Sequence, residues 1–246
     1  MSRDMELARR YVSEARNILV FTGPRLDMSG VSPVFEYDAE ERVVSPVSYD
    51  DFCRSTLSKL IYWRYAEKRY GGFFPAVPKA CHMIFAELEK RGKLYALVTL
   101  SGDSMHRASG IYTDRLVELH GTMLYAECTD CYDWSDIREA FAEFSRTGAP
   151  PQCGTCGGWL RPGLLLPGEA PDLCELRRAF SRAEKCDLAI SAGTVLSESV
   201  SASVPLAVKA GGGRYITVND TETAHDRYAD ISLKGPLMEI LQGIIS

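Results

Sequence analysis

Hydrophobic residues along this chain follow two different spacings. Residues 5–16 place apolar side chains on one face of a helix, at Leu7, Ala8, Tyr11, Val12 and Ala15. Residues 18–22 form a continuous apolar or β-branched run that ends at a glycine, which is typical of a buried strand. The two kinds of segment alternate toward both ends of the chain, and this predicts a parallel sheet with helices on both faces.

The remaining elements follow from the same reading. The pattern predicts helices over residues 50–70, 79–91, 171–185, 203–210 and 236–244. It predicts strands over residues 94–100, 115–121, 187–193, 214–219 and 230–235. Residues 28–50 show no clear period and are expected to form a long loop, of the kind that often serves as a functional lid.

Composition narrows the class of protein. The chain has 246 residues, of which 46% are hydrophobic and 25% charged, as in ordinary folded proteins. Its net charge is −5 and it has no basic stripe, so nucleic-acid binding is not expected. It has no apolar run of membrane-spanning length, and its polar start does not resemble a signal peptide, so we expect a cytoplasmic protein without a membrane partner.

Four of the eight cysteines form two C-x-x-C pairs, Cys128 with Cys131 and Cys153 with Cys156. Two such pairs, 21 residues apart, can supply four thiolates to one tetrahedral metal ion. The set leaves no position for an exchangeable ligand, so we expect a structural Zn²⁺ site in a small module that interrupts the strand–helix alternation over residues 122–165.

The order of several short motifs then becomes specific. A strand with a glycine turn precedes "TLSGDSMHRASG", "HG", the four cysteines, "LRPGLLLPGE", "SAGTVLS" and "ITVN". Over roughly residues 5–241 this order resembles the sirtuin (Sir2) family of NAD-dependent protein deacylases. The resemblance implies a Rossmann-type α/β domain from residues 1–30, 76–121 and 166–246. It also implies a small domain built from two inserts, a helical or loop segment over 31–75 and the zinc ribbon over 122–165.

The resemblance also implies an NAD⁺ site, with contacts from Gly23, Arg25, Phe35, Ser101, Asp103, Gly193, Thr194 and Asn219. The first family motif, "GAGISAESGIPDFR", reads "GPRLDMSGVSPVFE" here. Pro24 lacks a backbone donor, and Arg25 adds a cation that can bind phosphate in place of lost donors. Asp27 and Glu36 add negative charge near an anionic pyrophosphate, which opposes binding.

The implied catalytic residues are His120, Ser101 and Asp103. His120 matches the family's general base, and an imidazole can take up a proton near neutral pH. Ser101 stands where the family's second motif, "TQNIDGLHQRAG", has its asparagine, and Leu100 stands in place of the glutamine. The implied substrate segment comprises Leu165, Leu166, Pro167, Gly168 and Glu169, where Leu166 and Pro167 replace two phenylalanines of the acyl-lysine tunnel.

Three functions remain open at this point. The first is an NAD-dependent protein-lysine deacylase that acts on an acyl-lysine protein or peptide. The second is a catalytically degenerate pseudo-sirtuin that binds a ligand or a protein. The third is an NAD-consuming ADP-ribosyltransferase or NAD hydrolase, which would use the same ribose carbon without an acyl-lysine tunnel.

Overall fold

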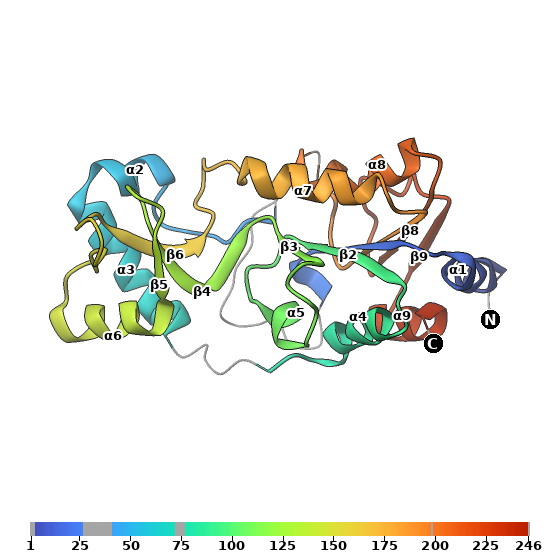
Figure 1. Cartoon of the computed structure of the whole chain (residues 1–246), viewed down its shortest axis with the longest axis horizontal. Helices are drawn as coiled ribbons and strands as arrows, with labels where there is room; N and C mark the ends of the chain where they lie inside the picture. The colour runs from blue at the N-terminus through green and yellow to red at the C-terminus, as the bar shows by residue number, and fades with distance from the viewer. Residues whose placement is uncertain (1–2, 27–40, 72–76, 198, 246) are drawn as a thin grey trace.

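A parallel sheet of six strands forms the centre of the computed structural model, which describes residues 3–26, 41–71, 77–197 and 199–245 (Figure 1). The strand order is β3-β2-β1-β7-β8-β9, and all neighbouring pairs run parallel. The strands are β1 (Ile18–Thr22), β2 (Leu94–Thr99), β3 (Leu116–Glu118), β7 (Leu188–Ala192), β8 (Arg214–Asn219) and β9 (Ile231–Lys234). The predicted parallel sheet is therefore confirmed.

Strand β1 shows why this sheet is covered on both faces. Every residue of β1 is buried, and its side chains alternate between two hydrophobic clusters. Ile18 and Val20 pack in the cluster that includes helices α1 (Arg3–Glu14), α4 (Ala80–Lys90) and α9 (Leu237–Ile245). Leu19 and Phe21 pack in the cluster that includes helices α7 (Leu173–Ala183) and α8 (Val204–Ala210). An unbroken apolar run is the sequence pattern expected of a strand with two buried faces.

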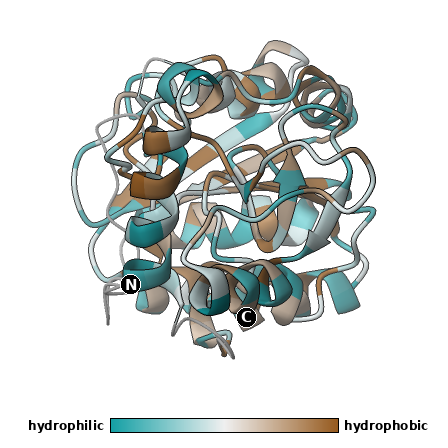
Figure 2. Cartoon of the chain, turned by 90° about the vertical axis from the view of Figure 1, so that its left-hand side faces the viewer, coloured by the Kyte–Doolittle hydropathy of each residue, from teal (hydrophilic) through white to brown (hydrophobic). Residues whose placement is uncertain are grey.

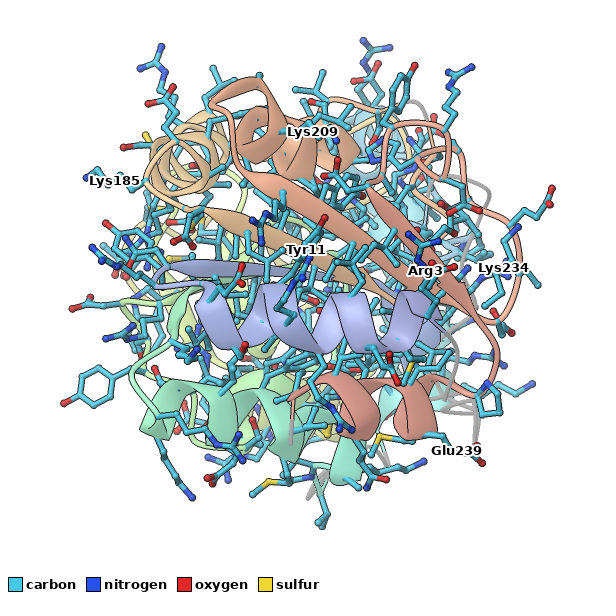
Figure 3. All side chains as sticks on the ribbon, turned by 90° about the vertical axis from the view of Figure 1, so that its right-hand side faces the viewer. Arg3, Tyr11, Lys185, Lys209, Lys234 and Glu239 are labelled. Carbon is cyan, nitrogen blue, oxygen red and sulfur yellow. The ribbon has the colours of Figure 1, made fainter. Side chains whose placement is uncertain are left out.

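The helices lie on the two sides of the sheet accordingly. In Figure 1, α7 and α8 lie above the strands, and α4 and α9 lie below them. Figure 3, viewed from the end where the chain termini lie, shows α1 next to α9. Arg9 Nε donates a hydrogen bond of 2.7 Å to the carbonyl oxygen of Gly243 in α9, which links the first helix to the last.

A second, antiparallel sheet with the order β5-β4-β6 lies at the other end of the molecule (Figure 1). Its strands are β4 (Gly121–Cys128), β5 (Trp134–Asp136) and β6 (Leu160–Leu164). Helices α2 (Tyr49–Arg54), α3 (Thr56–Tyr70) and α6 (Ile137–Thr147) share one hydrophobic cluster with this sheet. Viewed from this end in Figure 2, the helices carry both hydrophobic and hydrophilic stretches, as helices with one buried side do.

Trp63 connects the elements of this cluster. Its side chain is fully buried, and its ring lies 5.5 Å from that of Phe141 and 5.8 Å from that of Phe144, both in α6. Its indole Nε1 donates a hydrogen bond of 2.9 Å to the carbonyl oxygen of Leu160 in β6. One side chain of α3 therefore contacts both the neighbouring helix and the neighbouring strand.

Two sequence predictions need adjustment. The helix expected over residues 50–70 is two helices, because Ser55 has an extended backbone and caps α3 by accepting a hydrogen bond from the Ser58 N–H. The loop expected over residues 28–50 lies mostly outside the described residues, and its last part enters α2 at Tyr49. The proposed boundaries between a Rossmann-type and a small domain stay a prediction.

Three short helical segments complete the described chain: α5 (Met105–Ala108) and the 3₁₀ turns η1 (Pro24–Leu26) and η2 (Ser201–Ser203). Among the described residues, no helix has the length and apolar character needed to cross a bilayer.

We expect Trp63→Ala to lower the free energy of unfolding by about 3–5 kcal/mol, because it opens a cavity and leaves the Leu160 carbonyl without its indole donor. Urea unfolding of the purified protein followed by circular dichroism measures this. Trp134→Ala is the matched control, because Trp134 is 70% exposed and its loss should cost less than about 1 kcal/mol. Equal losses in the two variants would contradict the central role of Trp63.

Candidate functional site

Several of the predicted site residues follow strands whose carboxyl ends meet at one edge of the parallel sheet. Thr22, the last residue of β1, pairs with Thr99 of β2 on one side and with Ala192 of β7 on the other. Asn219 ends β8, and His120 follows β3. In open α/β sheets, ligands bind in the crevice outside the carboxyl ends of the strands, so this edge is the candidate site.

The turn after β1 packs directly against the turn after β7. A Cβ atom on Gly23 would lie 2.5 Å from Thr194 Cβ, and one on Gly193 would lie 2.3 Å from the Leu26 nitrogen. Gly193 also has a φ of +62°, which side chains rarely adopt. Both glycines are therefore required by the close approach of two backbone segments.

This packing uses the backbone donors of the first turn. The Gly23 N–H donates to the Ala192 carbonyl at 3.2 Å, and the Arg25 N–H donates to the Gly193 carbonyl at 3.0 Å. The Leu26 N–H closes the turn on Gly23, and Pro24 has no N–H. Every amide of residues 23–26 is thus accounted for within the protein. The Arg25 side chain is exposed, and its role as a phosphate ligand stays a prediction.

Glu41, which the sequence did not point to, contacts the turn after β7 through its side chain. Its carboxylate accepts a hydrogen bond from the Thr194 hydroxyl and another, of 2.7 Å, from the Val195 N–H. Burial raises the pKa of Glu41, against the lowering effect of these two hydrogen bonds and of the Arg25 charge. Its φ of 59° is unusual for a residue with a side chain. Nothing in the sequence pattern singled out Glu41, because it falls in a stretch without periodicity.

His120 is buried and held through both its ring and its backbone. Its Nδ1 lies 3.1 Å from the carbonyl oxygen of Glu41, and its own carbonyl accepts a hydrogen bond of 3.1 Å from the Leu165 N–H. A carbonyl oxygen can only accept, so Nδ1 is the protonated nitrogen in this contact and the lone pair of the neutral ring is on Nε2. This contact favours the tautomer with its proton on Nδ1.

Position 121, directly after His120, requires a glycine for a reason that is independent of the imidazole. Gly121 begins β4 with a φ of +77°, and a Cβ there would lie 1.9 Å from the Gly163 carbonyl oxygen in β6. Strands β4 and β6 can pair at this point only if Gly121 has no side chain. In the "HG" pair, the histidine supplies a positioned imidazole, and the glycine allows strand β4 to approach strand β6 closely.

The buried polar atoms without a hydrogen-bond partner in the described part of the chain include Ser101 Oγ, just after β2, and Asn219 Oδ1, at the end of β8. Leaving such an atom without a partner in the interior costs about 1–3 kcal/mol, and a ligand hydroxyl would satisfy it. Asp103 is half-buried, and its carboxylate accepts a hydrogen bond of 2.9 Å from the Met105 N–H at the start of α5. Their contacts with a cofactor stay predictions.

The segment from Leu165 to Glu169 forms a closed turn. Glu169 accepts hydrogen bonds from the Leu166 N–H at 2.9 Å and from Arg161 Nη2 at 2.6 Å. Burial raises the pKa of Glu169, and the Arg161 charge opposes that rise. The two charges therefore have a structural role, because the arginine holds the glutamate that closes the turn.

The predicted substrate residues differ in their surroundings. Leu166 is buried and belongs to the cluster around Trp63, whereas Leu165 is half-buried and Gly168 is exposed with a φ of +83°. The Pro167 carbonyl accepts a hydrogen bond of 3.0 Å from the Tyr49 N–H. A cavity of about 420 Å³ opens beside this segment, with Leu165, Glu169, Gly121, Tyr49 and Tyr125 in its lining. Binding of a substrate by these residues stays a prediction.

The four predicted metal ligands come together. The Sγ atoms of Cys128, Cys131, Cys153 and Cys156 all lie within 4.8 Å of one another. Two of the separations are 3.5 and 3.7 Å, close to the edge of about 3.8 Å for a tetrahedron with Zn–S bonds of about 2.3 Å. The amides of Asp130 and Gly158 donate hydrogen bonds to Cys128 Sγ and Cys156 Sγ, which helps to position these two sulfur atoms. The cluster fits a structural zinc ion.

The fold and the cysteine cluster define a class of protein: a parallel Rossmann-type sheet joined to a zinc-binding module. The model of the Sir2 family matches residues 34–200, which is more than half of the chain, and the chain belongs to that family. The family expected from the order of the motifs is therefore confirmed.

Curated relatives agree with this assignment. The chain is 32% identical to an NAD-dependent protein deacylase of Pyrococcus abyssi, over 96% of this chain and 94% of that protein. It is 35% identical to NAD-dependent protein deacylase 1 of Archaeoglobus fulgidus, over 74% of this chain and 72% of that protein.

Solved structures share the fold. Sir2 bound to an acetylated peptide superposes with a TM-score of 0.84, at 23% identity and with 100% of this chain and 98% of that chain covered. Sir2Af2 bound to a myristoylated histone peptide superposes with a TM-score of 0.76, at 28% identity, over 100% of this chain and 96% of that chain.

We expect the wild-type protein to carry one zinc ion per chain and Cys128→Ser to lose it, because three thiolates and a hydroxyl hold zinc less tightly than four thiolates. Elemental analysis after gel filtration gives the stoichiometry. Cys174→Ser is the control, because Cys174 is an exposed cysteine outside the cluster. A wild-type protein free of zinc, or zinc retained by Cys128→Ser, would contradict the site.

We also expect Gly121→Ala to destabilise the protein more than Gly148→Ala does. Both glycines have a positive φ, of +77° and +67°, so both variants carry the same kind of backbone strain. Only at Gly121 does the added Cβ meet another atom, because nothing lies within 4 Å at Gly148. Thermal unfolding should show a small decrease in Tm for Gly148→Ala and a clearly larger one for Gly121→Ala. Similar decreases would argue against the close β4–β6 approach.

Proposed function

We propose that this chain is an NAD⁺-dependent protein-lysine deacylase in which His120 is the general base. The observation that carries the proposal is the contact of 3.1 Å between His120 Nδ1 and the Glu41 carbonyl oxygen, which favours a proton on Nδ1 and a lone pair on Nε2. The named deacylase and deacetylase activities of the curated relatives support the same reaction.

The residues at the sheet edge fit the cofactor in part. Ser101 Oγ and Asn219 Oδ1 are buried polar atoms whose missing partners suit sugar hydroxyls, and Asp103 lies in the same loop as Ser101. Thr194 and Val195 offer a hydroxyl and an amide donor suited to an anionic group. When bound, NAD⁺ supplies an electrophilic ribose carbon that the acyl-lysine oxygen can attack.

His120 would act through Nε2. With Nδ1 donating to the Glu41 carbonyl, the ring can accept a ribose hydroxyl proton at Nε2 and share the resulting positive charge with that carbonyl dipole. The Leu165 N–H holds the His120 backbone, so the base and the substrate segment are connected by one hydrogen bond of 3.1 Å. This connection couples the position of the base to the segment proposed to receive the peptide.

The substrate is proposed to be an acyl-lysine protein or peptide bound next to Leu165–Glu169. The 420 Å³ cavity beside this segment is large enough for several atoms of a peptide side chain. The solved relatives include Sir2 proteins bound to propionylated, acetylated and myristoylated peptides, which supports this class of substrate.

One observation favours the second function, a pseudo-sirtuin. Within residues 23–26, the described part of the first turn, all amide donors are used internally, and the Glu41 carboxylate holds the Thr194 hydroxyl and the Val195 amide of the second turn. A site in this state binds a dinucleotide weakly unless Glu41 moves. The third function, ADP-ribosyl transfer or NAD hydrolysis, is favoured by the loss of both tunnel phenylalanines at Leu166 and Pro167.

The proposal is tested by isothermal calorimetry with NAD⁺, followed by an assay of nicotinamide release with and without an acetyl-lysine peptide. We expect saturable binding, release that depends on the peptide, and at least a 100-fold loss of release in His120→Ala. His120→Ala should still bind NAD⁺ within a few-fold of the wild type, which serves as the control for folding. Release without peptide would indicate the hydrolase, and no binding at millimolar NAD⁺ would indicate the pseudo-sirtuin.

A further inference from the structure

Glu41 stands out because a buried carboxylate occupies two donors that suit an anionic ligand. Its side chain accepts from the Thr194 hydroxyl and the Val195 amide, and only 2% of the residue is exposed. Both donors belong to the turn after β7, at the carboxyl edge of the sheet where the cofactor is proposed to bind.

In residues 23–26, the described part of the first turn, every backbone amide is already used within the protein. The amides of Gly23, Arg25 and Leu26 all donate to carbonyl groups within the protein. In the turn after β7, the Thr194 hydroxyl and the Val195 amide donate to an acidic group, and that group is the Glu41 carboxylate of the chain itself. A negatively charged ligand that used the same two donors would meet the Glu41 carboxylate at contact distance, and like charges repel there.

Glu41 holds this position at a conformational cost. Its φ of 59° lies in the left-handed region, which residues with side chains adopt rarely and mainly where surrounding contacts fix them. The contacts that fix it are the two side-chain hydrogen bonds and the one from His120 to its carbonyl oxygen. The side chain can leave the two donors while the backbone carbonyl remains at His120, because different atoms make the two contacts.

We propose that Glu41 determines the affinity of this chain for NAD⁺, by acting as an internal anion that must leave Thr194 and Val195 before a cofactor phosphate can bind. The inference rests on the proposed function, because it concerns the same cofactor site. In the state seen here, the Glu41 side chain takes the two hydrogen bonds that a cofactor phosphate would otherwise accept from Thr194 and Val195.

The experiment compares the zinc-loaded full chain with Glu41→Gln and Glu41→Ala. Calorimetric titrations use NAD⁺ and ADP-ribose, which keeps both phosphates but lacks nicotinamide. Glu41→Gln preserves size and removes the charge, and Glu41→Ala removes the side chain. Glu139→Gln is the matched control, because it neutralises an exposed glutamate on α6, a helix that packs with the antiparallel sheet. We expect both Glu41 variants to bind each ligand at least tenfold more tightly than the wild type, and Glu139→Gln to match the wild type.

A second measurement needs no cofactor. The Val195 N–H donates to Glu41, so its hydrogen exchange, followed by NMR, should be slow in the wild type and several-fold faster in Glu41→Ala. Equal exchange in the two proteins would overturn the inference by showing that the contact does not form. Equal dissociation constants for all four proteins would also overturn it while leaving the proposed function intact. Failure of all four proteins to bind either ligand would reject the proposed function, and the inference with it.

Discussion

The close contact between the turns that follow β1 and β7 determines the character of the whole site. Gly23 and Gly193 let two backbone segments meet without side chains between them, and the resulting hydrogen bonds use the amides of the first turn. In a dinucleotide-binding fold, the corresponding turn usually leaves its amides to a pyrophosphate. Here the amides of residues 23–26 bond within the protein, and in the turn after β7 the Thr194 hydroxyl and the Val195 amide donate to a side chain, that of Glu41.

The two halves of the candidate site are consequently in different states. On the side proposed for the sugar, Ser101 and Asn219 each keep a buried polar atom without a partner among the described residues. On the side proposed for the phosphate, Glu41 already accepts hydrogen bonds from Thr194 and Val195. In the proposed complex, the cofactor would supply partners on the first side and compete with the Glu41 carboxylate on the second.

Much of this could be predicted from the sequence, and the reasons differ between elements. The parallel strands were predictable because a strand buried on both faces must be apolar throughout, as β1 is. The four cysteines were predictable because metal ligation fixes their spacing.

The break at Ser55 was not predicted, because the polar and apolar spacing continues across it while a single cap changes the backbone. Glu41 was out of reach for another reason: its importance comes from Thr194, 153 residues away, and no local pattern records such a contact. The roles of Arg25 and Asp103 stay predictions, and Phe35 lies outside the described residues.

Strand β4 begins directly after His120, at Gly121, and ends at Cys128, one of the four clustered cysteines. A single extended segment of about 25 Å thus connects the imidazole to the metal ligands. The same strand pairs with β6, and the residue after β6, Leu165, donates its amide to the His120 carbonyl, so a metal ion held by the four thiolates would brace the two strands that border His120.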